Sequence, residues 1–129
     1  MDRVKDKVVI VTGGALGIGR ATCKLLAQEG AKVAVTDIMD DDGKETVKDI
    51  QNDGGEAEYW HLDVSDENQV EQVFKEVQQQ FRKITSLVNN AGVAGVNKPT
   101  HEIKENEWDE VMAINVKGVF FCTKHAIPY

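Results

Sequence analysis

A cluster of glycines directly follows a short apolar run, and this pairing limits the folds open to the chain. The run 7–12 reads KVVIVT, which is β-branched and apolar on both faces, as in a buried parallel strand. Four glycines come next, at Gly13, Gly14, Gly17 and Gly19. Apolar residues then recur at helical spacing until Gly30, a residue type that often ends helices. The order of strand, glycine-rich turn and helix predicts the start of a βαβ unit.

The same alternation continues to the end of the chain. Strand patterns are expected at 7–12, 31–36, 57–62 and 86–89. Helix patterns follow each strand, at 18–29, 42–52, 66–81 and 105–125. Strands that alternate with helices predict a parallel sheet with helices on both faces. We therefore expect an α/β fold.

Some boundaries and faces can be predicted more closely. Asp40, Asp41 and Asp42 fit the first turn of a helix, where carboxylates meet the positive end of the dipole. Ser65 is expected to be the N-cap of the third helix. The inward positions of the last helix are expected to be Trp108, Val111, Met112, Asn115, Val116, Val119, Phe120 and Thr123.

The glycine turn fits a phosphate site. A pyrophosphate must approach the amides at a helix N-terminus closely, and side chains there would keep it away. The spacing differs from the common G-x-G-x-x-G pattern, because the sixth position counted from Gly17 is Thr22. A glycine-rich turn that binds nothing remains an alternative.

Asp37 ends the second expected strand, 18 residues after Gly19. In a dinucleotide fold this position meets the adenosine ribose, and an acid there accepts hydrogen bonds from the ribose hydroxyls. Its charge would repel a 2′-phosphate, so NAD is favoured over NADP. The alternative is an ordinary helix-capping aspartate.

Asn115 interrupts an apolar helical face. Burying an amide without partners costs about 1–3 kcal/mol, so this side chain is expected to bond to a local group or to a water. A backbone carbonyl is the alternative partner that has no functional role.

Composition excludes several other functions. The formal net charge is −7 and no basic patch stands out, which argues against a nucleic-acid partner. Cys23 and Cys122 lack the spacing of a zinc site or of a disulfide framework, so no metal is expected. Apolar runs are too short to span a membrane, and the first fourteen residues lack the core of a signal peptide. We expect a cytoplasmic protein of at most one domain.

Four motifs together resemble the short-chain dehydrogenase/reductase family, classical type. They are the turn from Thr12 to Gly19, the pair Asp63-Val64, the segment NNAG at 89–92, and Asn115 in INVKG. The resemblance implies a partial Rossmann-type doubly wound sheet with strand order 3-2-1-4. It also implies that residues 1–129 form the amino-terminal part of a single dinucleotide-binding oxidoreductase domain.

The resemblance implies a role for each matching residue. Cofactor binding falls to Gly13, Gly17 and Gly19 at the pyrophosphate, Ile18 near the nicotinamide, Asp37 at the ribose, Asp63 and Val64 at the adenine, and Asn90, Ala91 and Gly92 in the crevice. Asn115 would be catalytic, holding a water in a proton relay. The implied reaction is hydride transfer between NAD and a small alcohol or ketone, in an enzyme that is a homodimer or homotetramer.

One family motif is missing from these residues. A catalytic tyrosine should precede a lysine by four positions, but Asp63 follows Tyr59 at that spacing and Tyr129 is the last residue. We therefore expect the 129-residue chain to be inactive alone and, with its fourth strand as a sheet edge, prone to self-association. A non-catalytic NAD-binding module or truncated product is one alternative. A flavodoxin-like domain is another, which Asp37, Asp63 and NNAG argue against.

Overall fold

A computed structural model describes residues 2–129. Its strands are β1 (Val8–Thr12), β2 (Lys32–Asp37), β3 (Glu56–His61) and β4 (Ser86–Val88), all parallel, in the order β3-β2-β1-β4. Its helices are α1 (Gly17–Gln28), α2 (Asp40–Asn52), α3 (Glu67–Phe81), α4 (Glu105–Met112) and α5 (Gly118–Ala126). A 3-10 turn (Thr100–Glu102) precedes α4, and a π turn (Ala113–Lys117) joins α4 to α5. The expected fold class and strand order are confirmed.

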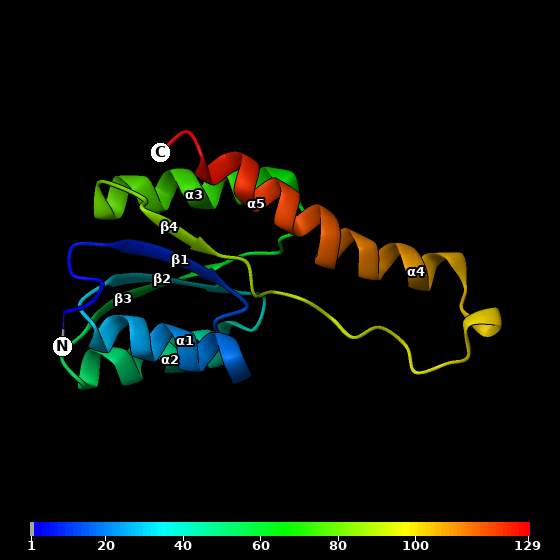
Figure 1. Ribbon diagram of the computed structural model, residues 1–129, viewed down its shortest axis with the longest axis horizontal. Coiled ribbons are helices and arrows are strands. Elements are labelled where there is room, and N and C mark those ends of the chain that lie inside the picture. The colour runs from blue at the N-terminus through cyan, green and yellow to red at the C-terminus, as the bar shows by residue number, and fades with distance from the viewer. Residues whose placement is uncertain (1) are drawn as a thin grey trace.

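Helices cover both faces of the sheet, with α1 and α2 on one side and α3 and α5 on the other (Figure 1). The alternating side chains of β1 supply both cores. Val9 and Val11 pack towards α1 and α2, whereas Val8 and Ile10 pack towards α3 and α5. All four are at most 2% exposed, and burying a side chain of this kind contributes about 1.5–3 kcal/mol. This double burial explains why β1 is apolar on both faces.

The carboxyl ends of the strands reach the same edge of the sheet. Thr12 pairs with Thr36, and Asp37 pairs with His61 one step further along. On the other side of β1, Val11 pairs with Val88 near the end of β4. The turns that follow all four strands therefore meet at one edge, where ligands bind in open parallel sheets.

The predicted helix starts are partly confirmed. Asp40, Asp41 and Asp42 do form the first turn of α2, which begins two residues earlier than predicted. The prediction for α3 is wrong, because its N-cap is Asp66, whose carboxylate accepts a bond from the Gln69 amide. Ser65 instead donates its hydroxyl to Asp63 Oδ1, at 2.6 Å. Both Ser65 and Asp66 are residue types that can cap a helix. Because the Ser65 hydroxyl is bonded to Asp63, Asp66 is the residue that caps α3.

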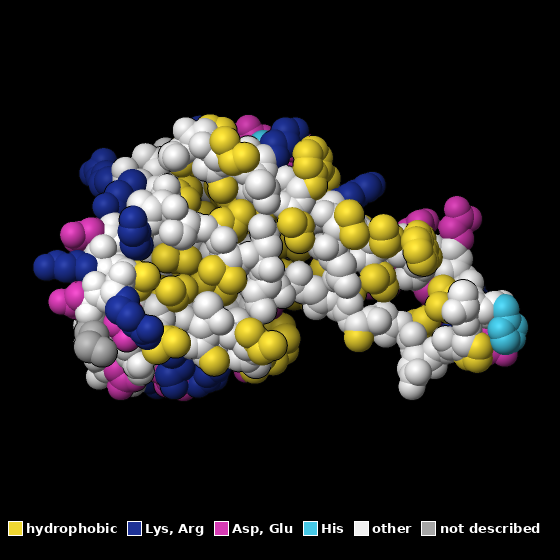
Figure 2. Space-filling view, viewed as in Figure 1, with side chains coloured by type: hydrophobic (Ala, Val, Ile, Leu, Met, Phe, Trp, Pro, Cys, Tyr) yellow, Lys and Arg dark blue, Asp and Glu magenta, His cyan; other side chains and the backbone are white. Residues whose placement is uncertain are grey.

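The inward face predicted for the last helix is also largely wrong, because only Val111 and Met112 of its eight residues are half-buried. Trp108, Val116 and Phe120 are 59%, 51% and 59% exposed, and Val119, Asn115 and Thr123 are exposed as well. The buried residues of α5 are Gly118 and Cys122. Figure 1 shows α4 extending beyond the sheet, and Figure 2 shows hydrophobic side chains at the surface along that extension. The segment is apolar on two faces, of which only one meets α3 and the sheet.

Both cysteines are buried and unpaired, and burial raises the pKa of each thiol to about 12. Between residues 2 and 129, no helix combines the length and the apolar character needed to cross a membrane. No group of three or more metal-binding side chains forms within this same described range.

Candidate functional site

A cleft of about 360 Å³ opens at the carboxyl edge of the sheet, a volume within the usual range for ligand sites. Seven of the residues predicted to bind cofactor line it, namely Gly13, Asp37, Asp63, Val64, Asn90, Ala91 and Gly92. They come from the end of β2 and from the turns after β1, β3 and β4. Gly17, Ile18, Gly19 and Asn115 are not among its lining residues.

The glycine turn leads the chain from β1 into α1 with little side-chain cover. Gly17 has a φ of +57°, in the left-handed region. A Cβ at Gly19 would overlap the carbonyl oxygen of Gly13, so this glycine permits close packing within the turn. The N-cap residue, Leu16, makes no side-chain capping bond, and the first turn of α1 contains no acid. The positive end of this helix is therefore left without a carboxylate from its own first turn.

Asp37 is fixed by the backbone around it. Its carboxylate accepts bonds from the Ala15 amide at 3.0 Å, and from the amides of Ile38 and Met39 at 2.7 and 3.0 Å. The Ala15 bond connects the end of β2 to the glycine turn. Asp37 therefore presents a negative charge in the cleft from an ordered position.

Asp63 also organises its own turn. Its Oδ1 atom accepts bonds from the amide and the hydroxyl of Ser65, at 2.9 and 2.6 Å. Val64 is 6% exposed and belongs to the core between the sheet and α3. This pair forms the wall of the cleft after β3.

The NNAG segment is bonded to the end of β1 through Thr12. The amides of Asn90 and Ala91 donate to the Thr12 hydroxyl, each at 3.0 Å. The Asn90 side chain donates to the carbonyls of Thr12 and Gly13 at 3.1 and 3.0 Å. The residues after β4 are thereby attached to the glycine turn, and both line the same cleft.

Asn115 lies on the π turn and is exposed, contrary to the prediction that it is buried. Its side chain donates to the Val93 carbonyl and accepts from the Val93 amide, both at 2.8 Å. The partner is thus the backbone of the loop after β4, and it includes a carbonyl, which was the alternative without a functional role. π turns are rare and are found often at functional sites.

Sequence reasoning gave no separate role to two threonines that hold the turns beside the cleft, although Thr12 begins the glycine-turn motif. Thr12 is 1% exposed, and Thr46 is fully buried with its hydroxyl 3.2 Å from the carbonyls of Gly14 and Ala15. Thr46 lies one helical turn before Ile50, on the inward face of α2. The spacing of Thr46 four residues before the apolar Ile50 was the available signal for it.

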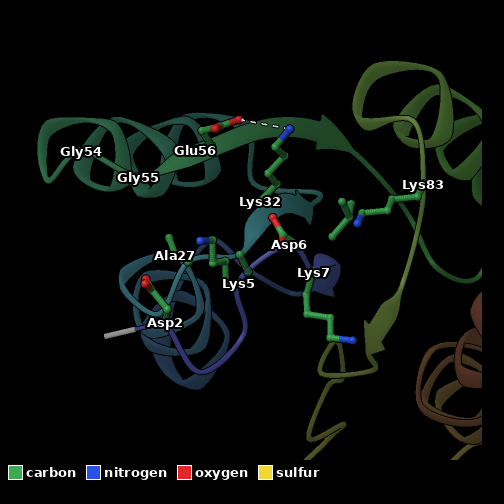
Figure 3. A pocket seen from close by; sticks show the side chains of 13 residues that line it. Asp2, Lys5, Asp6, Lys7, Ala27, Lys32, Gly54, Gly55, Glu56 and Lys83 are labelled. Atoms are coloured by element: carbon green, nitrogen blue, oxygen red, sulfur yellow. Dashed lines mark ion pairs between the residues drawn. The ribbon is translucent and has the colours of Figure 1, made fainter.

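A second cavity of about 360 Å³ lies at the opposite, amino end of the sheet. Figure 3 shows it surrounded by lysines and carboxylates, including Lys32 and Glu56, whose charged atoms are 3.8 Å apart. None of the predicted site residues lines it. Since ligands of open parallel sheets bind at the carboxyl ends, the cleft near Asp37 is the better candidate site.

Comparison with known proteins gives a consistent result. The family profile described as short chain dehydrogenase matches residues 7–129. An uncharacterized oxidoreductase of Bacillus subtilis is 41% identical over 128 residues, with 99% of this chain and 47% of the relative covered. A cyclopentanol dehydrogenase of Comamonas sp. is 42% identical over 127 residues, with coverages of 98% and 50%. The chain thus spans about half the length of the curated relatives it matches.

Solved structures agree with the sequence relatives. A dehydrogenase/reductase from Sinorhizobium meliloti superposes with a TM-score of 0.94 at 34% identity. The match covers 98% of this chain and 50% of the solved one.

Proposed function

This chain belongs to the short-chain dehydrogenase family, and we propose that its cleft binds NAD for hydride transfer between the nicotinamide and a small alcohol or ketone. Members of the family bind nicotinamide cofactors and act on small molecules. The choice of NAD over NADP rests on one observation, the Asp37 carboxylate that lines the cleft. That carboxylate would accept hydrogen bonds from the ribose and would repel a 2′-phosphate.

Each of the other predicted site residues would contact a different part of the cofactor. Gly13, Gly17 and Gly19 would admit the pyrophosphate to the first turn of α1, which lacks a carboxylate of its own. Ile18, at 80% exposed, would lie towards the nicotinamide. Asp63 and Val64 would contact the adenine. Asn90, Ala91 and Gly92 would line the crevice between them.

Asn115 would support proton transfer indirectly, because its side chain fixes the main chain of the π turn against the loop at Val93. Its side-chain amide is already bonded in both directions to Val93. A relay water would therefore be held by the main chain of the π turn instead of by the Asn115 amide. The bound cofactor would supply or accept the hydride.

The 129 residues would bind cofactor without turning it over. The tyrosine and lysine that the family spaces four apart do not occur at that spacing here. We take the chain to be the amino-terminal part of a single oxidoreductase domain, and the whole protein to be a homo-oligomer. If the purified chain binds NAD but forms no NADH with a panel of secondary alcohols, the result would support binding without catalysis. NADH formation by the chain alone would contradict it.

Calorimetric titration of the protein with NAD and NADP tests the cofactor assignment. The unaltered protein should bind NAD more tightly. Asp37→Ala should lower the ratio of the NADP to the NAD dissociation constant by about tenfold. The variant would lose the hydrogen bonds from the ribose of NAD to a charged carboxylate, which are stronger than those between neutral groups. Asp41→Ala, an exposed acid on α2, is the matched control and should leave the ratio unchanged. An unchanged ratio in Asp37→Ala would refute the ribose assignment.

A further inference from the structure

Tyr59 on β3 connects both ends of a short turn at the cleft. Its hydroxyl oxygen lies 2.7 Å from the Asp37 carbonyl oxygen and 2.6 Å from Asp40 Oδ1. Asp37 ends β2 and Asp40 begins α2. The Tyr59 ring lies against the backbone of α2 at Gly43, where an added Cβ would overlap the ring atoms. The phenol is therefore held at the junction of strand and helix.

Both ends of this turn have a further partner on β3 or just after it. The Leu62 amide donates to the Asp37 carbonyl at 2.9 Å, and His61 Nδ1 lies 2.7 Å from Asp40 Oδ1. The bonds from Tyr59 and His61 hold the pKa of Asp40 below its usual range. Burial and the nearby Asp40 raise the pKa of Tyr59. At neutral pH the phenol is thus the donor and Asp40 the acceptor.

The clamped turn includes the surface that would meet the ribose. Asp37, Ile38 and Met39 all line the cleft. The amides of Ile38 and Met39 donate to the Asp37 carboxylate, so the path of the turn sets where that carboxylate points. Tyr59 itself is absent from the lining residues. Any effect that it has on a nucleotide must therefore pass through the turn.

We propose that Tyr59 is a positioning residue for nucleotide selectivity, which holds the turn 37–40 so that Asp37 accepts the ribose hydroxyls and rejects a 2′-phosphate. The proposal rests on the NAD-binding function proposed above. It differs from a purely structural role of Tyr59, which would change stability and leave the preference between the two nucleotides intact.

The test is Tyr59→Phe, which removes the hydroxyl and keeps the ring against Gly43. Dissociation constants for NAD and NADP are measured by calorimetry in the purified protein. The ratio of the NADP to the NAD constant should fall by about threefold to tenfold, as expected for loss of one hydrogen-bond donor, whose single proton is shared between the Asp37 carbonyl and Asp40 Oδ1. Trp60→Phe is the matched control, since Trp60 packs edge-on against Phe81 on the other side of β3. It should leave the ratio unchanged.

A second background separates action through Asp37 from a general disturbance. If Tyr59 acts through Asp37, Tyr59→Phe should not change the ratio further in an Asp37→Ala protein. An unchanged ratio in Tyr59→Phe alone, or an equal loss in both backgrounds, would overturn the proposal. Should Tyr59→Phe fail to fold, Asp40→Ala removes the exposed partner and must lower the ratio for the proposal to stand. An unaltered protein that binds neither nucleotide would instead refute the function itself.

Discussion

Asn115 and Val93 are joined by two hydrogen bonds of 2.8 Å, one in each direction between the side-chain amide and the main chain. Val93 belongs to the loop after β4, whereas Asn115 lies in the π turn between α4 and α5. Within the described residues, the π turn is the only break between α4 and α5. It is therefore attached to the loop that borders the cleft.

Asn115→Ala should remove both bonds and release the loop. Because the side chain is exposed, the free energy of unfolding should fall by only about 1 kcal/mol. The sharper measurement is hydrogen exchange at the Val93 amide, which should become faster. Asn106→Ala, an exposed asparagine on α4, is the control and should not alter it. Unchanged exchange at Val93 would show that the loop is held by other contacts.

Thr12→Val should destabilise the protein despite its similar shape. The hydroxyl accepts bonds from the amides of Asn90 and Ala91, and Thr12 is 1% exposed. Leaving those amides without their acceptor should cost about 2 kcal/mol. Urea denaturation measures this loss, and Thr12→Ser, which keeps the hydroxyl, should recover most of it. A valine variant as stable as the unaltered protein would contradict the assignment.

Ile18→Asp should separate stability from cofactor binding. Residue 18 is in the first turn of α1, where a carboxylate favours the helix by about 0.3–1 kcal/mol. The same charge would oppose a pyrophosphate at that helix end, so the NAD dissociation constant should rise about tenfold. Thermal unfolding and calorimetry measure the two effects. Ile18→Asn controls for side-chain size. Equal NAD affinity in both variants would contradict the placement of the pyrophosphate at this turn.

Glu67 should make stability depend on pH. Its carboxylate bonds to Lys124 Nζ and His125 Nε2, at 2.7 and 2.8 Å, and so joins α3 to α5. These bonds, that from Lys124 first, lower its pKa in the folded protein. The stabilisation is therefore complete above the unfolded pKa of about 4.3. It is lost as the pH falls through the lower folded value.

Urea midpoints of the unaltered protein and of Glu67→Gln test this dependence. The difference between them should be largest at neutral pH and should shrink below about pH 4. Glu71→Gln, on the same helix, should show no such change. A difference that stays constant with pH would mean that the ionised carboxylate is not responsible.

The fold could be predicted because its strongest signals are local. The fully apolar β1 required burial on both faces, and the glycines after it required a turn into a helix. The alternation of elements then left a parallel sheet as the expected result. The strand pattern placed Asp37 at the end of β2, whereas Asp63 and Asn90 were assigned to the same site only through the family resemblance; all three line one cleft.

The final helix was predicted less well because its expected inward positions advance by four residues, from Met112 to Val116 and Phe120. At 100° per residue, each such step overshoots a full turn by about 40°, so these positions drift around the helix. The buried Gly118 and Cys122 instead share a side with Val111, which is half-buried. The partner of Asn115 could not be predicted either, because nothing in the local sequence indicates a bond to Val93.

The three amides that hold Asp37 have a consequence for the kinetics of binding. Its carboxylate is ordered before any ligand arrives, so the proposed adenosine end of the cleft would require no rearrangement and would lose little entropy on binding. The other end is bordered by residues 92–102, all of them exposed. We expect the nucleotide to dock by its adenosine half first, in a fast step that depends on concentration.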